Sequence, residues 1–495
     1  MKKICFVLIF SLLILIMLAS CASNENPVSV NGNETVQNAD DISAEASQTI
    51  TSETVDLNDD LQDLNFNGYE FKMLTRTIDY ANCAMDAEEI NGDALNDAVY
   101  ERNRRIEERF NIKFNNITTY DSGKARNSIK AGDGAYDLIM TRNPDAFNIF
   151  AQEGLINGLD KLTYINLDKP YWDKKLTAEL SVANKRFFAV GAFNLSAYDF
   201  VHVLMFNKQL ILNYGMPNPY DMVKNGTWTF DAYADMAKNA TRSLTGGDKM
   251  TKDDAYGYLS APKQVLPDFW ISAGLKSINK DENDIPYSTM GTEKFLEVFQ
   301  KIYSITWGNN SWFVNTAGEN IPADQLKMFE NNQGLFMDCT FFYLKSLRSM
   351  ESDFGILPYP KYDEQQKEYY SRMEGCELFF SPITASQESL DVSSAVLEAL
   401  SSESAKTVIP VYYDLALKTK FTRDNESAEI LDVLFANRVF DLGDTVWCDK
   451  VRDPIFAEMF KKNNMDLVSK LDSLNKTIET LITKTVAAFE KLNQD

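Results

Sequence analysis

Phe200-Val201-His202-Val203-Leu204-Met205-Phe206 is an uninterrupted apolar run of the kind that forms a buried strand. A second compact apolar run, Tyr136-Asp137-Leu138-Ile139-Met140, has the same character. Stretches with apolar residues at helical spacing separate these runs from further strand-like stretches. Strands that alternate with helices predict an α/β fold whose sheets are parallel or mixed.

The residues around these two runs extend the alternation. Alternating apolar residues predict a strand at 69–73 and another from Ile112, with an amphipathic helix between them. Further helices are predicted at 230–240, 295–303 and 390–400. In open α/β sheets ligands bind beyond the carboxyl ends of the strands, so we expect the loops 76–82 and 141–145 to face a ligand.

The chain contains a single histidine, His202, which excludes several classes of enzyme. A Ser-His-Asp or Cys-His triad needs an imidazole beside its nucleophile. Because His202 lies inside an apolar run, we expect a buried side chain with one hydrogen bond instead of a catalytic base. We therefore predict no catalytic residue.

Length and charge set further limits. The 495 residues exceed what one hydrophobic core supports, so two or more domains are expected. A net charge of -23 makes nucleic acid an unsuitable partner, because its phosphates need clustered Lys and Arg. The same charge argues against docking on anionic lipid. No ATPase or zinc signature is present, and we predict no cofactor and no metal.

Cysteines are sparse and follow no metal-binding spacing. Cys5 and Cys21 lie near the N-terminus, and the others are scattered over the rest of the chain: Cys83, Cys339, Cys376 and Cys448. In a large domain such a set favours isolated buried thiols. A bridge between Cys339 and Cys376 stays open as the alternative, because sequence does not fix pairing.

The N-terminus predicts export. Lys2 and Lys3 precede an apolar run of about 15 residues that ends in Leu18-Ala19-Ser20-Cys21, which is typical of a secretory signal at residues 1–20. The run is shorter than the roughly 20 apolar residues that a membrane-spanning anchor needs. Cys21 after Leu-Ala-Ser resembles a bacterial lipobox. That resemblance implies a lipidated Cys21 as the mature N-terminus, and a protein held at the outer face of the cytoplasmic membrane.

The next segment lacks the composition of a folded domain. Residues 22–65 hold no aromatic side chain until Phe66 and are rich in Ser, Asn, Thr, Asp and Glu. Such a segment buries too little apolar surface to offset its ordering entropy. We predict that residues 21–65 form the lipidated cysteine and a disordered acidic tether, with the folded part starting at Phe66.

Several motifs in the folded part occur in a recognisable order. They include Val203-Leu204-Met205-Phe206-Asn207-Lys208, then Gly226-Thr227-Trp228-Thr229-Phe230, then Phe354-Gly355-Ile356-Leu357-Pro358-Tyr359-Pro360-Lys361. Together they resemble the extracellular solute-binding lipoproteins of bacterial ABC sugar importers, related to maltose-binding proteins. We read Trp228 itself as a core residue and leave it out of the site.

The resemblance implies a two-lobe, periplasmic-binding-protein-like (type II) α/β fold with a hinge and an interlobe cleft. Lobe 1 is expected at residues 66–199 plus 335–382, and lobe 2 at residues 200–334 plus 383–495. The expected function is capture of a carbohydrate, more specifically an oligosaccharide, by lobe closure, with delivery to an ABC-type permease. The expected partners are that solute, the permease and the lipid anchor, and the protein is expected to be a monomer.

The resemblance also implies a set of ligand-binding residues. Lobe 1 would supply polar groups from Arg76, Asp79, Thr141, Arg142, Asn143 and Asp145. Tyr198 and Asp199 would lie where the hinge meets the site. The aromatic surfaces that sugars need would come from Trp270, Phe341, Phe342 and Trp447, with Asp338 beside them.

Other functions remain open at this stage. An exported glycoside hydrolase needs two carboxylates at a defined gap, and 72 acidic residues do not single out a pair. A surface adhesin, or a binding protein for peptides or polyamines, is also compatible with the sequence. The apolar positions from Leu467 to Leu492 approach a heptad pattern, and we favour packing on the protein's own surface over a coiled-coil dimer.

Overall fold

The computed structural model describes residues 55–76, 85–314, 323–347, 350–415 and 426–491. The predicted signal, Cys21, Cys83, Asp79 and the tether up to residue 54 lie outside the described residues. Among the described residues, no helix combines the length and the hydropathy needed to cross a membrane.

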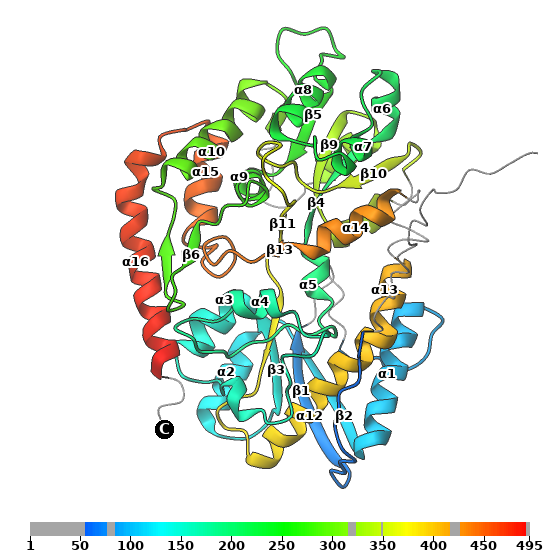
Figure 1. Cartoon of the computed structure of the whole chain (residues 1–495), viewed down its shortest axis with the longest axis vertical. Coiled ribbons are helices and arrows are strands. Elements are labelled where there is room, and N and C mark those ends of the chain that lie inside the picture. Colours follow the sequence, from blue (N-terminus) through cyan, green and yellow to red (C-terminus); the bar gives the residue numbers. More distant parts are fainter. Residues whose placement is uncertain (1–54, 77–84, 315–322, 348–349, 416–425, 492–495) are drawn as a thin grey trace, which may run out of the picture. The chain divides into compact units, whose positions relative to one another are not determined.

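The first sheet is mixed and has the strand order β12-β3-β1-β2 (Figure 1). Three strands are parallel and the fourth, β12, runs antiparallel to β3. Phe71 and Met73 have no exposed surface, which explains the alternating pattern of the first strand. The strands are β1 (Tyr69–Arg76), β2 (Ile112–Thr119), β3 (Leu138–Arg142) and β12 (Glu377–Phe380).

Two predicted helices are confirmed beside this sheet. α1 (Ala94–Phe110) begins at Asp93, whose carboxylate accepts the backbone N–H groups of Leu95 and Asn96. α12 (Gln387–Glu403) packs against α1 and β1. The shorter elements that follow in the first part of the chain are α2 (Ser122–Ala131), α3 (Asn143–Asp145), α4 (Lys174–Glu179) and α5 (Ser196–Asp199).

The second sheet has the order β10-β4-β9-β5-β8. The apolar run around His202 forms β4, the second strand in this order, with every residue buried. β4 runs antiparallel to both of its neighbours, β9 and β10. The strands are β4 (His202–Asn207), β5 (Tyr256–Ser260), β8 (Trp312–Val314), β9 (Gly334–Thr340) and β10 (Phe354–Leu357).

Helices α8 and α10 confirm the predicted stretches at 230–240 and 295–303. Trp228, just before α8, has no exposed surface and donates its indole N–H to the carbonyl of Pro358, which confirms it as a core residue. The helices after β4 are α6 (Lys208–Asn213), α7 (Pro219–Lys224), α8 (Phe230–Ala240), α9 (Pro262–Ser272), α10 (Glu293–Tyr303), α11 (Ala323–Glu330), α13 (Ile409–Leu415), α14 (Glu426–Ala436) and α15 (Glu458–Lys461).

The chain passes between the two sheets in segments that hydrogen-bond to each other. The backbone N–H of Phe341 donates to the carbonyl of Val201 at 2.8 Å, and that of Glu374 donates to Phe200 at 3.0 Å. Val201 also forms an antiparallel bridge with Met373. Two short pairs complete the strands: β6 (Ile278–Lys280) with β7 (Pro286–Ser288), and β11 (Ser371–Arg372) with β13 (Arg438–Val439).

The strand pairings divide the chain differently from the lobe boundaries expected above. β9 and β10 belong to the second sheet although both lie within 335–382 or at its edge, and within that range only β12 joins the first sheet. α12, expected in lobe 2, packs on the first sheet's helix α1. The reason is that buried strands have similar apolar sequences, so an apolar run does not specify which sheet it joins.

The folded part also begins earlier than predicted, because residues 55–65 are ordered against the first sheet's helices. Arg109 makes a two-pronged ion pair with Asp59, at 2.6 and 2.9 Å. Lys169 contacts Asp56 and Asp60, and the hydroxyl of Ser402 donates to the carbonyl of Leu57. The prediction of disorder was wrong for this stretch, because its acidic residues have specific cationic partners that composition alone does not reveal.

The C-terminal helix α16 (Leu467–Lys491) packs on the protein itself, as predicted. The ring of Phe489 lies 5.3 Å from that of Phe147 and 4.9 Å from that of Phe187. Cys339, Cys376 and Cys448 are free thiols, which confirms isolated cysteines over a Cys339–Cys376 bridge.

Candidate functional site

Polar side chains gather where the strands of the first sheet end. β1 and β3 end at Arg76 and Arg142, and the antiparallel strand β12 begins at Glu377, which pairs with Arg142 on the same edge. Arg76 donates to Glu377 Oε1 at 2.7 Å, and this ion pair is almost fully buried. The carboxyl ends of β1 and β3 thus lie at one edge, as expected. Residues 77–84, which follow β1, lie outside the described residues.

Short elements add hydroxyl and carboxylate groups to this edge. Ser122, the first residue of α2, donates to Asp145 Oδ2 at 2.8 Å and lies 3.0 Å from the hydroxyl of Thr141. Arg142 donates to Asp145 Oδ1 at 3.3 Å. Three predicted residues, Thr141, Arg142 and Asp145, are therefore in one contact group.

A segment from the C-terminal part of the chain reaches the same edge. The side-chain amide of Asn148 donates to the carbonyl of Val446 at 2.8 Å. Burial lowers the pKa of Arg142, but Asp145, the Cys448 thiol and Glu377 raise it by more. Cys448 is thus close enough to act on Arg142, and it follows Trp447, a fully buried residue.

Four buried polar atoms linked to this edge have no hydrogen-bond partner among the described residues. They are Asn143 Nδ2, Asn148 Oδ1, Glu377 Oε2 and Trp447 Nε1. Each such atom costs about 1–3 kcal/mol when it is left unpaired, so a group of them is unusual in a folded protein. Similar atoms occur elsewhere among the described residues, but this group combines two donors with two acceptors.

The linking segment passes close to this group at Gly375. A Cβ atom at that position would lie 2.6 Å from Asn143 Oδ1, so a larger residue would force the Asn143 amide to shift. Burial raises the pKa of Glu377, and this effect exceeds the opposite effects of Arg76 and Arg142. The carboxyl group with the unpartnered oxygen is therefore easier to protonate than an ordinary glutamate.

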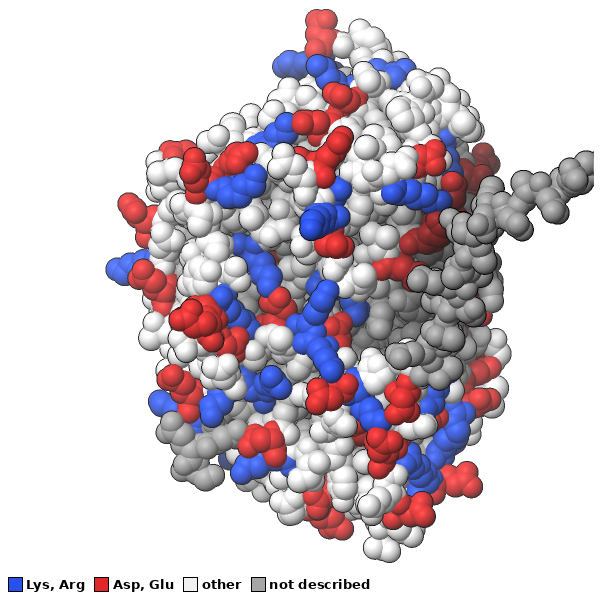
Figure 2. All heavy atoms as spheres, in the orientation of Figure 1, with Lys and Arg blue, Asp and Glu red and all other residues white. Residues whose placement is uncertain are grey.

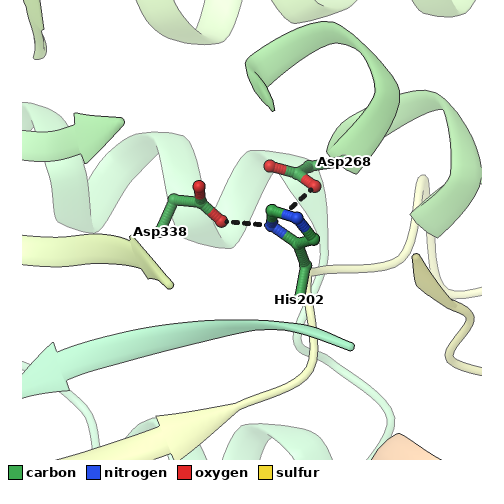
Figure 3. Close-up of side chains that lie close together, drawn as sticks. All are labelled: His202, Asp268 and Asp338. Carbon is green, nitrogen blue, oxygen red and sulfur yellow. Dashed lines mark hydrogen bonds and ion pairs between the residues drawn. The ribbon is translucent and has the colours of Figure 1, made fainter. Parts of the chain in front are cut away.

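A second cluster, the Arg372 network, lies at the start of β4. His202 Nδ1 is 2.9 Å from Asp338 and 3.4 Å from Asp268, and all three side chains are buried (Figure 3). Arg372 contacts Asp268 at 3.0 Å and Asp444 at 2.6 and 2.9 Å. His202 is buried as predicted, but it has several charged neighbours where one hydrogen bond was expected.

The charges of the Arg372 network shift each other's pKa values. Burial lowers the pKa of His202, but Asp268 and Asp338 raise it to about 10 overall. Burial and Asp338 raise the pKa of Asp268 to about 7. His202, Asp268 and Asp338 could offer one nitrogen and two oxygen ligands to a cation. The Arg372 guanidinium already lies 3.0 Å from Asp268 and competes with a metal ion there, so we treat these residues as an ion network.

The remaining predicted aromatic residues lie in cores. Trp270 was expected to offer its ring to the ligand, but it lies in a core. Its indole N–H donates to buried Asp441 at 3.3 Å, and its ring contacts Phe295 and Phe456. Phe341 and Phe342 are also buried, and Phe341 lies 5.2 Å from the Phe435 ring.

The hinge residues Tyr198 and Asp199 meet α13, where Asp199 accepts a 2.7 Å hydrogen bond from Tyr412. Asp338 belongs to the Arg372 network and not to the sheet edge. Of the predicted site residues, the sheet edge therefore unites Arg76, Thr141, Arg142, Asn143 and Asp145, and Trp447 lies in the chain between two residues linked to this edge, Val446 and Cys448.

Sequence reasoning missed Glu377, Asn148, Ser122 and the Arg372 network. Glu377 carried a usable signal, because it is a lone acid at the start of the apolar run Leu378-Phe379-Phe380. Asn148 is one polar residue inside a helical stretch and carries no such signal. Arg372 finds its partners 72 to 170 residues away, which no local pattern encodes.

A surface hollow of about 530 Å³ lies at the opposite end of the first sheet. It is lined at the amino end of β2 and on α1 by Asn65, Arg104, Glu107, Glu108, Asn111, Ile112 and Lys113. Its position away from the carboxyl ends of the strands separates it from the sheet edge described above.

Comparisons with known proteins agree with this architecture. Residues 87–324 match the family described as bacterial extracellular solute-binding protein. No curated protein sequence matches the chain. An ABC substrate-binding protein from Listeria monocytogenes in complex with cycloalternan superposes with a TM-score of 0.55 at 15% identity, covering 83% of this chain and 99% of the other.

Two further solved structures are similar. A cyclo/maltodextrin-binding protein complexed with maltotetraose gives a TM-score of 0.54 at 12% identity, over 87% of this chain and 99% of its own. A sugar transporter protein from Rhizobium etli in an open conformation gives 0.53 at 13% identity, over 85% and 100%. The fold is thus that of two-lobe binding proteins.

Proposed function

We propose that the chain is a bacterial extracellular solute-binding protein, the family that residues 87–324 match, and that it captures a neutral, hydroxyl-rich solute, a carbohydrate, at the first sheet's edge. The observation that carries this proposal is the set of unpartnered buried atoms on Asn143, Asn148, Glu377 and Trp447. A solute that pairs with these atoms recovers the cost of burying them.

The chemistry of the four atoms favours hydroxyl groups. Trp447 Nε1 and Asn143 Nδ2 are donors, whereas Asn148 Oδ1 and Glu377 Oε2 are acceptors. A sugar hydroxyl both donates and accepts, so it can pair with either kind. A polyamine offers only donors and a carboxylate ligand only acceptors, and each would leave half of the set unpaired.

The charges at this edge also suit a neutral solute. Arg76 is paired with Glu377, and Arg142 with Asp145. On the face drawn in Figure 2, basic and acidic side chains are interspersed, so the net charge does not gather there into a patch of one sign. The sugar ligands named for the Listeria protein and for the cyclo/maltodextrin-binding protein are consistent with this proposal.

The proposed cycle uses two lobes built on the two sheets. Lobe 1 holds the β12-β3-β1-β2 sheet with α1 and α12, and lobe 2 holds the five-stranded sheet with α8 to α10. The linking segments at Phe200–Val201, Phe341 and Met373–Glu374 act as the hinge. Solute contacts made from both sides shift the population toward closure, and a permease of the ABC type receives the loaded, chemically unaltered solute.

The cellular setting is also a proposal. Cys21 carries a lipid that holds a monomeric protein at the outer face of the cytoplasmic membrane, with residues 22–54 as the tether. The solute-binding family supports an extracellular site of action. Incorporation of a labelled fatty acid into the full chain, absent in Cys21→Ala, tests the anchor.

A thermal-shift screen of the mature chain tests the function. The panel holds mono- and oligosaccharides, short peptides and polyamines, and we expect only sugars to raise the melting temperature. Trp447→Phe, which removes the unpartnered donor, should weaken the response, whereas Trp307→Phe, remote from the edge, should not. A response to peptides or polyamines alone would refute the carbohydrate proposal. Release of shorter sugars on long incubation would instead show a glycoside hydrolase.

A further inference from the structure

Tyr120 is an exposed aromatic residue placed directly beyond the sheet edge. β2 is the outer strand of the first sheet, and its last residue, Thr119, pairs in register with Arg76 of β1. Tyr120 is the next residue along the chain, and 55% of its surface is exposed. An exposed tyrosine at this point cannot be explained by core packing.

The ring of Tyr120 is linked by contacts to the unpartnered atoms. The guanidinium carbon of Arg76 lies 5.8 Å from the centre of the Tyr120 ring. The same guanidinium donates to Glu377 Oε1, and the other oxygen of that carboxylate is the unpartnered Oε2. Arg76 thus lies between an exposed aromatic ring and a buried acceptor.

We propose that Tyr120 is an outer subsite that packs against a second sugar ring, so that the solute is an oligosaccharide of at least two units. The inference rests on the proposed function and deepens it. The inner unit pairs its hydroxyls with Asn143, Glu377 and Trp447, while the next unit lays its apolar C–H face on the aromatic ring. Flat aromatic surfaces suit this role because sugars combine apolar faces with polar edges.

Arg76 has a positioning role in this arrangement. Its ion pair with Glu377 fixes the guanidinium, and the cation then holds the Tyr120 ring through its face or edge. A ring held in this way loses little freedom on binding, which favours affinity for the longer solute.

The test is calorimetric titration of the mature chain with malto-, cello- and xylo-oligosaccharides of one to four units. For the series that binds, Tyr120→Ala should weaken binding of the two-, three- and four-unit members about tenfold and leave the single unit unchanged. Tyr120→Phe should keep the wild-type preference, because the ring remains. Tyr287→Ala, at an exposed tyrosine of β7, is the matched control and should change nothing.

Two outcomes separate the claims. If the wild-type chain binds none of these sugars, the proposed function fails and the subsite fails with it. If the wild-type chain binds them and Tyr120→Ala keeps the same length preference, only the subsite is refuted. If Tyr120→Ala loses transport while its affinity for the sugars is unchanged, the subsite is also refuted, since Tyr120 would then act on the permease.

Discussion

Two regions of this protein bury polar groups, and they differ in whether those groups are paired within the protein. In the Arg372 network, the guanidinium contacts Asp268, Asp444 and His202, so charges are neutralised inside the protein. At the sheet edge, Trp447 Nε1 and Asn143 Nδ2 are equally buried but have no partner among the described residues. The first arrangement stabilises the fold, and the second leaves hydrogen bonds for a solute.

The comparison is sharpened by the two carboxyl groups beside His202. Asp268 Oδ2 and Asp338 Oδ2 also lack a partner among the described residues. The raised pKa of Asp268, about 7, means that this carboxyl holds a proton over much of the acidic range. Its O–H group is then a donor, and the network can complete its own hydrogen bonds with a proton. No proton can do this for the indole of Trp447, which is already a donor.

The largest expected effect is on stability, at Arg372. Arg372→Met leaves buried Asp268 with only His202 and buried Asp444 with only the longer contact to Arg452, which should lower the free energy of unfolding by about 3–5 kcal/mol. Urea unfolding followed by circular dichroism measures the loss. A loss below about 1 kcal/mol would show that the network is no more important than a surface ion pair.

The next effect separates stability from binding, at Trp447. Trp447→Phe removes a donor that has no partner in the described chain, so the unliganded protein should lose only the packing of the larger buried ring, about 1 kcal/mol of stability. Affinity for the sugar found in the screen should fall by about 1–3 kcal/mol, measured by titration calorimetry. Equal losses in both quantities would erase the distinction between the two regions.

The pH dependence of stability should also come from the network. A pKa raised from 3.8 to about 7 means that Asp268 stabilises the fold fully below pH 3.8 and that this contribution is lost as the pH rises through 7. His202 adds a later loss between 6.5 and about 10. Asp268→Asn should therefore flatten the decline between pH 4 and 7 by up to about 1.4 kcal/mol per pH unit.

That pH profile has a built-in check. Asp441, whose pKa burial raises to about 6, titrates in the same direction and stays in the variant, so some slope should remain. The loss above pH 7, attributed to His202, should become smaller, because Asp268 is one of the two carboxylates that raise the pKa of His202 and only Asp338 remains. An unchanged slope between pH 4 and 7 would show that Asp268 titrates normally.

The smallest effect is expected at Arg142. Its ion pair with Asp145 spans 3.3 Å and the Arg142 side chain is half exposed, so Arg142→Ala should cost less than about 1 kcal/mol of stability. The free energy of unfolding of Arg142→Ala should fall with added salt no more than that of the wild type does. A loss comparable to that of Arg372→Met would place Arg142 in a network of its own.

The sequence predicted those parts of the fold that depend on local pattern. The helix at α1, the buried strand β4 and the packing of α16 all follow from spacing of apolar residues. The carboxyl-end rule then placed Arg76 and Thr141 at one edge. It could not place Trp270, because burial by Phe295, Phe456 and Asp441 depends on elements far away in the chain.

The same limit explains the other misses. Sheet membership of β9 and β10 depends on which strand each one meets, and buried strands share one composition. Residues 55–65 appear tether-like by composition, whereas Arg109 and Lys169 order them through ion pairs. Long-range contacts of this kind form only in the folded chain and produce no periodic pattern in the sequence.

The interleaved chain path has a consequence for biosynthesis. β3 gains its neighbour β12 only when the ribosome has made residues 377–380, more than two hundred residues after β3 itself. Until then the nascent chain carries an unpaired strand edge, which is prone to wrong association. Export in an unfolded state and chaperone binding would both protect that edge, and a fragment ending before Glu377 should aggregate.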